Sequence, residues 1–321
     1  MAKLAFLFPG QGSQAVGMGR SFVEKSEEAG RLFRQADEIL GYGLSKLCFE
    51  GPEEELRLTK NTQPALLLVS VAAYRLLGRE PAVAAGHSLG EYSALVAAGG
   101  LSFDDALRTV HRRGLYMQEA VPVGEGAMAA VLGAKAADLE AAFARVTSGV
   151  VQIANWNSLD QIVIAGHKAA VEEALRMARP PRSVMLPVSA PFHSALMKSA
   201  EERLAADLDR LTFHDLRFPV VTNVDGRAVR RGEEARDALK RQVSRPVLWY
   251  KSMESLAGES VDAFIELGSG KVLAGLIKRI GKGWDHPFSV WNVEDADSLE
   301  KTRAALQDDF GRRTDGPNLT K

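Results

Sequence analysis

The segment Gly86-His87-Ser88-Leu89-Gly90 has the residue types of a catalytic serine turn. It follows a short apolar run that ends at Ala85, and it precedes a helix-like segment, residues 91–98. Two glycines at this spacing permit a sharp strand-to-helix turn that projects the serine hydroxyl from the end of a sheet. Ser88 is therefore a candidate nucleophile, and the N–H of Leu89 is placed to stabilise an oxyanion. The alternative is a glycine-rich turn that carries a surface serine.

A serine nucleophile requires a general base, and His193 suits this role best among the six histidines. It lies in a loop, residues 189–194, before a helix expected at 195–211. The N-terminus of that helix disfavours the imidazolium form, so the ring would be neutral and able to accept a proton. A structural histidine that caps the helix is the alternative. His87 is a poorer base for Ser88, because adjacent side chains diverge in such a turn.

A second glycine-rich turn, residues 9–14, directly follows an expected strand at Leu4–Phe8. At the carboxyl end of a strand in an α/β sheet, such a turn can bring amide groups to the active-site cleft. Gln11 could then donate a hydrogen bond to a reacting carbonyl oxygen. The turn lacks the Gly-Lys-Ser/Thr ending that a phosphate-binding loop requires, and a plain tight turn is the alternative.

Apolar runs that suit buried strands alternate with amphipathic helical stretches, which predicts an α/β fold with a largely parallel sheet. Ser102, followed by an acidic pair, marks the start of one of the helices. Besides the elements already named, the strands expected in this sheet are residues 82–85, 219–223 and 263–267. The expected helices are residues 62–77, 103–120, 233–243 and 272–280.

The middle of the chain predicts a separate small domain with the order β-α-β-β-α-β, which is typical of a ferredoxin-like module. Its strands are expected at residues 127–132, 150–154, 161–165 and 183–188, and its helices at 134–146 and 167–178. The second and third strands would be connected through Asn155-Trp156-Asn157-Ser158. The expected domains are therefore an α/β-hydrolase-like domain from residues 1–124 and 189–310, and an inserted ferredoxin-like domain at 125–188. A cleft between them would hold the active site, and the polar tail, 311–321, is expected to be disordered.

The composition of the 321-residue chain excludes several classes of protein. Forty basic and forty-one acidic residues leave a net charge of −1, which gives no reason to expect binding to nucleic acid or to a membrane surface. The single cysteine, Cys48, rules out an internal disulfide. The N-terminal apolar run is too short for a signal peptide, and no other stretch is long and apolar enough to cross a bilayer. We therefore expect a cytoplasmic protein.

Five ordered motifs resemble the malonyl-CoA:acyl carrier protein transacylases of fatty-acid synthesis and the related acyltransferase domains of polyketide synthases. The resemblance extends from Leu4 to about Ile280. The motifs, in order, are Phe8-Pro9-Gly10-Gln11-Gly12-Ser13-Gln14; Thr62-Gln63-Pro64-Ala65; Gly86-His87-Ser88-Leu89-Gly90-Glu91-Tyr92; Arg113-Gly114 with Met117-Gln118-Glu119-Ala120; and His193 with Leu196-Met197.

The resemblance implies a role for several of these residues. Ser88 would carry the malonyl ester, and His193 would activate it as the general base. The backbone carbonyl of Gln242, in place of a carboxylate, would orient His193. Gln11 and the Leu89 N–H would form the oxyanion site.

The same resemblance makes Arg113 the residue that selects a dicarboxylic acyl group. Its planar guanidinium can hold the free carboxylate of malonate through two parallel hydrogen bonds. Without the resemblance, a solvated helix face would be the favoured interpretation of this arginine. Phe192 matches the phenylalanine of malonyl-selective members, where it would crowd a methyl-branched substrate. Many members have serine there instead.

The implied reaction is ping-pong transfer of malonyl from malonyl-CoA, through Ser88, to the phosphopantetheine thiol of acyl carrier protein. No cofactor or metal is expected, and the enzyme would act as a monomer. The carrier could belong to fatty-acid or polyketide synthesis. A serine thioesterase or esterase and a non-catalytic carrier-docking module are the alternatives. Carrier proteins are acidic, so a basic rim is expected, with candidates Arg179, Arg182, Arg227, Arg230, Arg231, Lys240 and Arg241.

Overall fold

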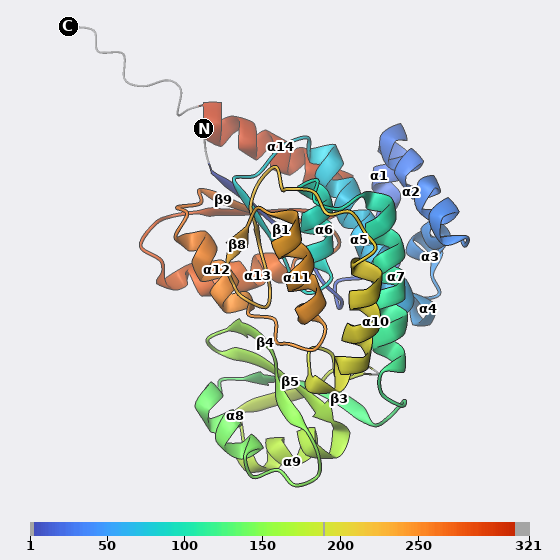
Figure 1. Ribbon diagram of the computed structural model, residues 1–321. Helices are drawn as coiled ribbons and strands as arrows, with labels where there is room; N and C mark the ends of the chain where they lie inside the picture. Colours follow the sequence, from blue (N-terminus) through green and yellow to red (C-terminus); the bar gives the residue numbers. More distant parts are fainter. Residues whose placement is uncertain (1–2, 189, 312–321) are drawn as a thin grey trace, which may run out of the picture.

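The computed structural model describes residues 3–188 and 190–311 of the chain (Figure 1). A six-stranded, mostly parallel sheet forms the centre of the larger part, and a separate four-stranded antiparallel sheet lies at one end of the molecule. The α/β fold class with a second, smaller sheet is therefore confirmed.

The large sheet brings the ends of its two central strands together. Its strand order is β10-β9-β1-β2-β7-β8, and every pair is parallel except the β7–β8 hairpin. Phe8, the last residue of β1, lies opposite Gly86, the last residue of β2. The turns that follow these strands are consequently neighbours. The strands are β1 (Leu4–Phe8), β2 (Val83–Gly86), β7 (Val220–Val221), β8 (Ala228–Val229), β9 (Ala263–Leu267) and β10 (Ser289–Val293).

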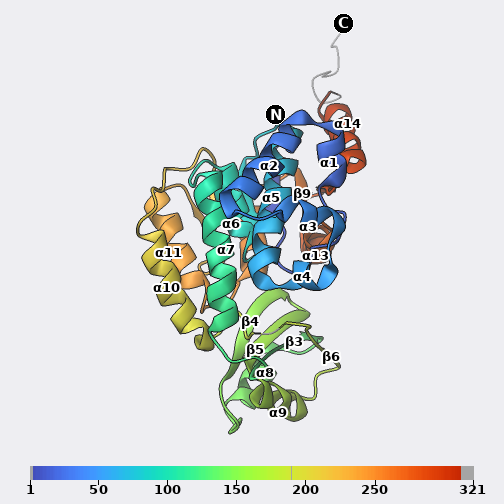
Figure 2. The same cartoon turned by 90° about the vertical axis from the view of Figure 1, so that its right-hand side faces the viewer.

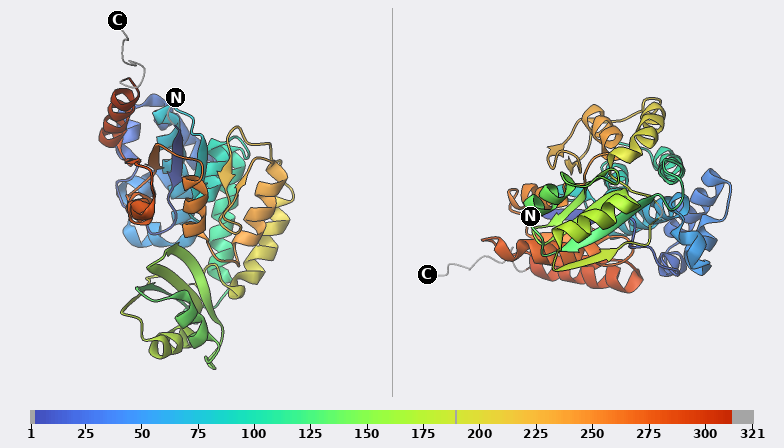
Figure 3. Two further views of the ribbon diagram at one scale, coloured as in Figure 1. Left: turned by 90° about the vertical axis from the view of Figure 1, so that its left-hand side faces the viewer. Right: turned by 90° about the horizontal axis from the view of Figure 1, so that it is seen from below.

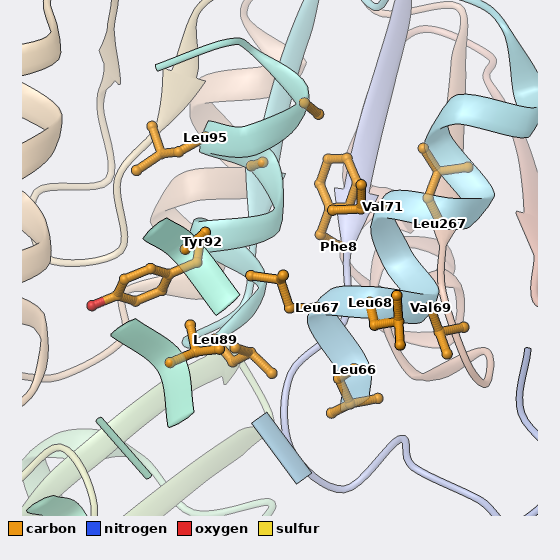
Figure 4. Close-up of a cluster of buried hydrophobic side chains, with 14 of the residues drawn as sticks. Phe8, Leu66, Leu67, Leu68, Val69, Val71, Leu89, Tyr92, Leu95 and Leu267 are labelled. Carbon is orange, nitrogen blue, oxygen red and sulfur yellow. The ribbon is translucent and has the colours of Figure 1, made fainter. Parts of the chain in front are cut away.

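Alternate residues of β1 pack into two different hydrophobic cores, as the period of a strand requires. Phe6 and Phe8 belong to the larger core, and Figure 4 shows Phe8 beside Leu67 and Val71. This face is covered by α5 (Thr59–Leu77), α6 (Gly90–Ala97) and α7 (Phe103–Glu119). Leu7 packs on the other face, against α12 (Trp249–Ala257) and α13 (Val272–Ile280).

Further helices extend the large domain on its outside. A 3₁₀ turn at Ala195–Met197 leads into α10, which packs along α7 and α11 (Figure 2). The remaining helices are α1 (Arg20–Lys25), α2 (Glu27–Leu40), α3 (Leu44–Glu50), α4 (Glu53–Arg57), α10 (Lys198–Leu208), α11 (Gly232–Gln242), η2 (Gly281–Gly283) and α14 (Ala296–Gly311).

The small sheet has the element order β-α-β-β-α-β that the sequence predicts, and its strand order is β4-β5-β3-β6. All of its strand pairs are antiparallel. Figure 3 shows this unit with its two helices at the end of the molecule away from the termini. Its elements are β3 (Gly126–Leu132), α8 (Ala136–Phe143), β4 (Val151–Ser158), β5 (Gln161–His167), α9 (Lys168–Ala178) and β6 (Arg182–Met185).

The prediction that residues 155–158 connect two strands is wrong, because β4 continues to Ser158. Two register shifts interrupt its pairing with β5. Between them, β4 pairs with the large domain: Trp156 N–H donates to the Val247 carbonyl at 2.9 Å, and Val247 N–H donates to the Ala154 carbonyl at 2.8 Å. Backbone hydrogen bonds thus join the two parts of the protein beside Asn155.

Several elements were missed or misplaced by the sequence analysis. The helices α1 to α4 are mostly too short to show a clear apolar period, and α12, β10 and α14 were not identified either. The helix expected at 195–211 is the 3₁₀ turn followed by α10, which ends at Leu208. Gly311, the first residue of the expected disordered tail, is the last residue of α14. The rest of that tail lies outside the described residues.

Within residues 3–188 and 190–311, none of the helices combines the length and the apolar character needed to span a bilayer.

Candidate active site

Ser88 occupies a strained turn between β2 and α6. Its φ angle is 51°, in the left-handed region that a residue with a side chain rarely adopts. The flanking glycines are required by close contacts. A Cβ atom on Gly86 would lie 1.9 Å from the carbonyl carbon of Gly90, and one on Gly90 would lie 2.0 Å from the Phe8 carbonyl oxygen. The two glycines therefore allow the serine turn to pack against the end of β1.

We expect Gly86→Ala to lower the free energy of unfolding by at least about 3 kcal/mol, because the new methyl group would overlap backbone atoms that cannot move aside. Urea denaturation of the purified variant measures this change. Gly275→Ala is the matched control: it lies inside α13, and its Cβ would meet nothing within 4 Å. That substitution should stabilise the protein by about 0.5–1 kcal/mol through helix propensity. Equal effects of both substitutions would contradict the packing argument.

His193 lies within hydrogen-bonding distance of the serine. Its Nε2 is 2.7 Å from the Ser88 Oγ, and its Nδ1 is 2.8 Å from the carbonyl oxygen of Gln242. A carbonyl can only accept, so Nδ1 carries the proton and Nε2 of the neutral ring accepts the Ser88 hydroxyl hydrogen. His193 itself has a φ of 58°, so both members of the pair lie in constrained backbone.

The imidazole of His193 is held neutral, as the sequence predicts, but mainly for a different reason. Burial lowers its pKa to about 3, and the positive charge of Arg113 contributes to the same shift. The hydrogen bond to Gln242 opposes it. The helix expected to begin directly after His193 starts instead with a 3₁₀ turn, Ala195–Met197. The free protein therefore presents an unprotonated base across the neutral pH range.

Arg113 is buried beside the serine and does not lie on a solvated helix face. Its side chain is 1% exposed, and it extends from α7 toward Ser88. One terminal nitrogen donates to Gln63 Oε1 at 2.7 Å, and the other donates to Ser88 Oγ at 3.1 Å and Gln242 Oε1 at 2.9 Å. These partners are all neutral, and in the part of the chain that the structure describes no carboxylate forms an ion pair with this guanidinium. Its charge is thus available to an anionic group that enters the site.

Gln11 and Leu89 lie at the edge of the same site, and both line its cavity. The turn that carries Gln11 can approach because Gly10 has no side chain: a Cβ there would lie 2.5 Å from the His87 carbonyl oxygen. The Gln11 side chain donates to Thr59 Oγ1 at 3.3 Å. The backbone or the side chain of Gln11, together with the Leu89 N–H, stays a prediction for the oxyanion site.

A cavity of about 280 Å³ opens in front of the serine and is lined by both parts of the protein. Phe192 lies in its wall and is 7% exposed. The small sheet contributes Asn155 and Asn157 from the part of β4 that was predicted as a connection. Asn157 Oδ1 is 3.0 Å from Nε2 of His87, so His87 is directed away from the nucleophile.

Sequence reasoning missed several polar residues around the site. Gln63 and Glu91 were quoted in motifs without a role, and Asn223 was only the end of an expected strand. All three are buried, and the Gln242 side chain contacts the site in addition to its carbonyl. Gln63 gave no clear signal in the local sequence, since the four residues before it in α5 are polar as well.

The family model named acyl transferase domain matches residues 5–305. The chain belongs to the acyl transferase family. The malonyl CoA-acyl carrier protein transacylase of Escherichia coli K12 is 50% identical over 288 residues, which cover 87% of this chain and 93% of the relative. The protein of the same name from Bacillus subtilis 168 is 49% identical over 290 residues, covering 88% and 92%. The resemblance stated from the motifs is confirmed, and with it the acyltransferase class.

Solved structures agree with this assignment. The malonyl CoA-acyl carrier protein transacylase of Coxiella burnetii superposes with a TM-score of 0.91 at 40% identity, and the match covers 95% of this chain and 98% of that one. A malonyl-transacylase solved in complex with a type II polyketide synthase acyl-carrier protein has a TM-score of 0.91 at 42% identity, with 95% and 100% covered.

Clusters of side chains that could hold a metal ion were sought among the described residues, and no group of three or more histidine, cysteine or acidic side chains was found there.

Proposed function

We propose that this acyltransferase moves a malonyl group from malonyl-CoA to the phosphopantetheine thiol of an acyl carrier protein. In the first half-reaction, His193 Nε2 takes the Ser88 hydroxyl proton while Oγ bonds to the thioester carbonyl carbon. The carbon–sulfur bond then breaks, and the CoA thiolate takes the proton from His193. The malonyl group remains as an ester on Ser88.

The second half-reaction repeats these steps in reverse with a new thiol. His193 takes the proton of the carrier thiol, whose sulfur attacks the ester carbonyl, and the Ser88 oxygen leaves with the proton from His193. In both halves the N–H groups of Gln11 and Leu89 would donate to the oxyanion, and the Gln242 carbonyl would keep Nδ1 protonated. No step requires a metal or an organic cofactor.

The observation that carries this proposal is a fully buried guanidinium, paired only with neutral groups, 3.1 Å from the nucleophile. A buried cation that no carboxylate contacts directly is costly, and the free carboxylate of malonate could supply such a contact. Binding of that carboxylate would offset the positive charge that helps to lower the pKa of His193. Substrate binding would thus also make His193 a better proton acceptor. An esterase for neutral acyl groups would need no cation to bind a distal carboxylate.

The carrier protein is the least constrained part of the proposal. Of the candidate basic rim residues, several already have acidic or carbonyl partners, and Arg179 and Arg182 lie on the small domain. The names of the relatives support an acyl carrier protein as the acceptor, and a polyketide carrier is supported by the solved complex. We propose a carrier of fatty-acid synthesis on the resemblance of the motifs, with the polyketide carrier as the alternative. The cytoplasmic location and the monomeric state stay predictions. The candidate rim residues that already form ion pairs do so as Arg227–Glu234, Arg231–Glu233, Lys240–Asp209 and Arg241–Asp225.

Intact-protein mass spectrometry after brief exposure to malonyl-CoA tests the proposal. We expect a mass gain of one malonyl group, localised to the peptide that contains Ser88, and its loss when a holo-acyl carrier protein is added. The malonyl group should then be found on the carrier. Rapid release of malonate to water without a carrier would favour the thioesterase alternative, and the absence of any adduct would favour the docking-module alternative.

A further inference from the structure

Two side chains hold the strained peptide units on either side of the Ser88 α-carbon. Asn223 Oδ1 accepts from the Ser88 N–H at 2.6 Å, and Asn223 Nδ2 donates to the Gly86 carbonyl at 2.7 Å. Gln242 Nε2 donates to the Ser88 carbonyl at 2.9 Å. Both backbone polar groups of the nucleophile are therefore fixed by amide side chains that are themselves fully buried.

Asn223 reaches this position because of the sheet order. It follows β7, which pairs with β2 so that Val221 lies opposite Ala85. The residues just beyond these two strands are consequently neighbours. The Asn223 carbonyl also accepts from the Leu248 N–H at 2.8 Å, which fixes the backbone from the other side. The side chain is thus aimed at the serine turn by the main sheet and not by a loose loop.

Glu91 connects the Asn223 backbone to the Gln242 side chain. It lies in the first turn of α6 and is 0% exposed. Its Oε2 accepts from the Asn223 N–H at 3.0 Å and from Gln242 Nε2 at 2.8 Å. Burial raises the pKa of this carboxyl to about 7, against the opposing effect of both hydrogen bonds and of Arg113. Glu91 is thus a buried acceptor shared by the backbone of Asn223 and the side chain of Gln242, and it holds these two residues together.

We propose that Asn223 and Glu91 are positioning residues for acyl transfer, which hold Ser88 in its left-handed conformation and Gln242 in register with it. Such a backbone conformation persists only when the surrounding structure over-determines it. Gln242 carries the effect further, because its carbonyl orients His193 and its Oε1 accepts from Arg113 at 2.9 Å. One buried network thus sets the positions of the nucleophile, the base and the arginine.

The network also assigns the donors of the oxyanion site. Because the Ser88 N–H is engaged by Asn223, it is not available to the substrate. Loss of the Asn223 side chain would free this N–H and allow the Ser88 peptide to rotate toward an unstrained φ. The hydroxyl would then leave the line between His193 and the acyl carbon, and a small displacement of reacting groups is expensive in rate.

The test measures the single-turnover rate of Ser88 acylation over a range of malonyl-CoA concentrations up to saturation. Because acylation by malonyl-CoA is part of the proposed function, this test rests on that function. We expect Asn223→Ala to lower the maximal rate at least tenfold while the malonyl-CoA concentration for half-maximal rate changes less than threefold. Glu91→Gln keeps an oxygen acceptor for both donors, so it should lose less than Glu91→Ala. Crystal structures should show Ser88 relaxed from its left-handed φ in Asn223→Ala.

Asn223→Asp adds a signature that general destabilisation would not produce. The aspartate keeps an acceptor for the Ser88 N–H, but when ionised it cannot donate to the Gly86 carbonyl. Protonation restores that donor, so its acylation rate relative to wild type should recover as the pH falls. This variant also keeps the test decisive if Asn223→Ala fails to fold.

Asn61→Ala is the matched control. Asn61 is another buried asparagine, and its side chain bonds to the Glu55 carbonyl and the Tyr42 hydroxyl, away from Ser88. It should lose stability without a change in acylation rate per folded molecule. Wild-type acylation rates in the folded Asn223 variants, or an unmoved Ser88 in their crystal structures, would overturn the positioning role and leave the proposed function intact. Failure of the wild-type protein to be acylated would instead overturn the proposed function, and the crystal structures would still decide the positioning role.

Discussion

Ser88→Ala should leave no malonyl adduct on the protein and lower the rate of malonyl transfer by about 10⁴-fold or more. The substitution removes the atom that forms the ester, which is also the hydroxyl that lies 2.7 Å from His193 Nε2. The oxyanion donors and the arginine would remain, so malonyl-CoA should still bind. Transfer is measured by following radiolabelled malonyl from CoA to the carrier, and binding by calorimetry.

Ser93→Ala provides the control for that experiment. Ser93 is a fully buried serine one turn along α6, and its hydroxyl has no hydrogen-bond partner among the described residues. Its removal deletes the same atom type from the helix that follows the Ser88 turn and should leave transfer unchanged within about twofold, as expected for a site outside the reacting groups. A malonyl adduct on the Ser88→Ala protein would show that a different residue is the nucleophile.

The sequence was most informative where chemistry and local backbone coincide. The two glycines around Ser88 were correctly interpreted as marks of a sharp turn. Gly86 lies against the backbone of Gly90, and Gly90 lies against the backbone of Phe8, so neither position has room for a side chain. The strand at β1 was located to the residue, because a short apolar run that ends in Pro-Gly leaves little choice of boundary. The spacing of apolar residues and the residue types of the turns are both local features, and they were sufficient to predict the α/β fold class.

Long-range contacts could not be obtained in this way. Asn223 lies 135 positions from Ser88 along the chain, and nothing in its neighbourhood indicates that its amide meets the serine turn. The same holds for the side chain of Gln242, whose carbonyl was assigned only through the resemblance. The error at residues 155–158 has this origin too, because β4 is extended by pairing with Val247 in the other part of the protein.

Arg113 shows both the limit and the use of a family resemblance. Composition alone favours an exposed arginine, since a helix with Arg112 beside it suggests a solvated face. The structure shows the opposite arrangement for the two neighbours: the Arg112 side chain is 55% exposed and pairs with Asp207, whereas Arg113 is buried among neutral partners. A buried charge whose hydrogen-bond partners are all neutral is the physical signal of a ligand site, and only the three-dimensional structure displays it.

Arg113→Ala should lower kcat/KM for malonyl-CoA by about 10³-fold, the effect of removing one partner of a buried, hydrogen-bonded charge pair, roughly 4 kcal/mol. Acetyl-CoA lacks the distal carboxylate, so the same substitution should lower kcat/KM for acetyl-CoA much less. Some loss is expected for both substrates, because Arg113 also donates to Ser88 Oγ and Gln242. The ratio of the two kcat/KM values therefore isolates recognition of the carboxylate, and it should shift toward acetyl-CoA by about 10²-fold or more.

Two further variants make the interpretation of Arg113→Ala specific. Arg113→Lys keeps the charge but cannot make two parallel hydrogen bonds to a carboxylate, so it should recover only part of the malonyl preference. Arg112→Ala removes the neighbouring exposed arginine and should change kcat/KM for either substrate less than about twofold. If Arg113→Ala lowers kcat/KM equally for malonyl-CoA and acetyl-CoA, the guanidinium positions Ser88 and Gln242 without binding the substrate carboxylate. The malonyl selectivity would then have to come from another part of the cavity.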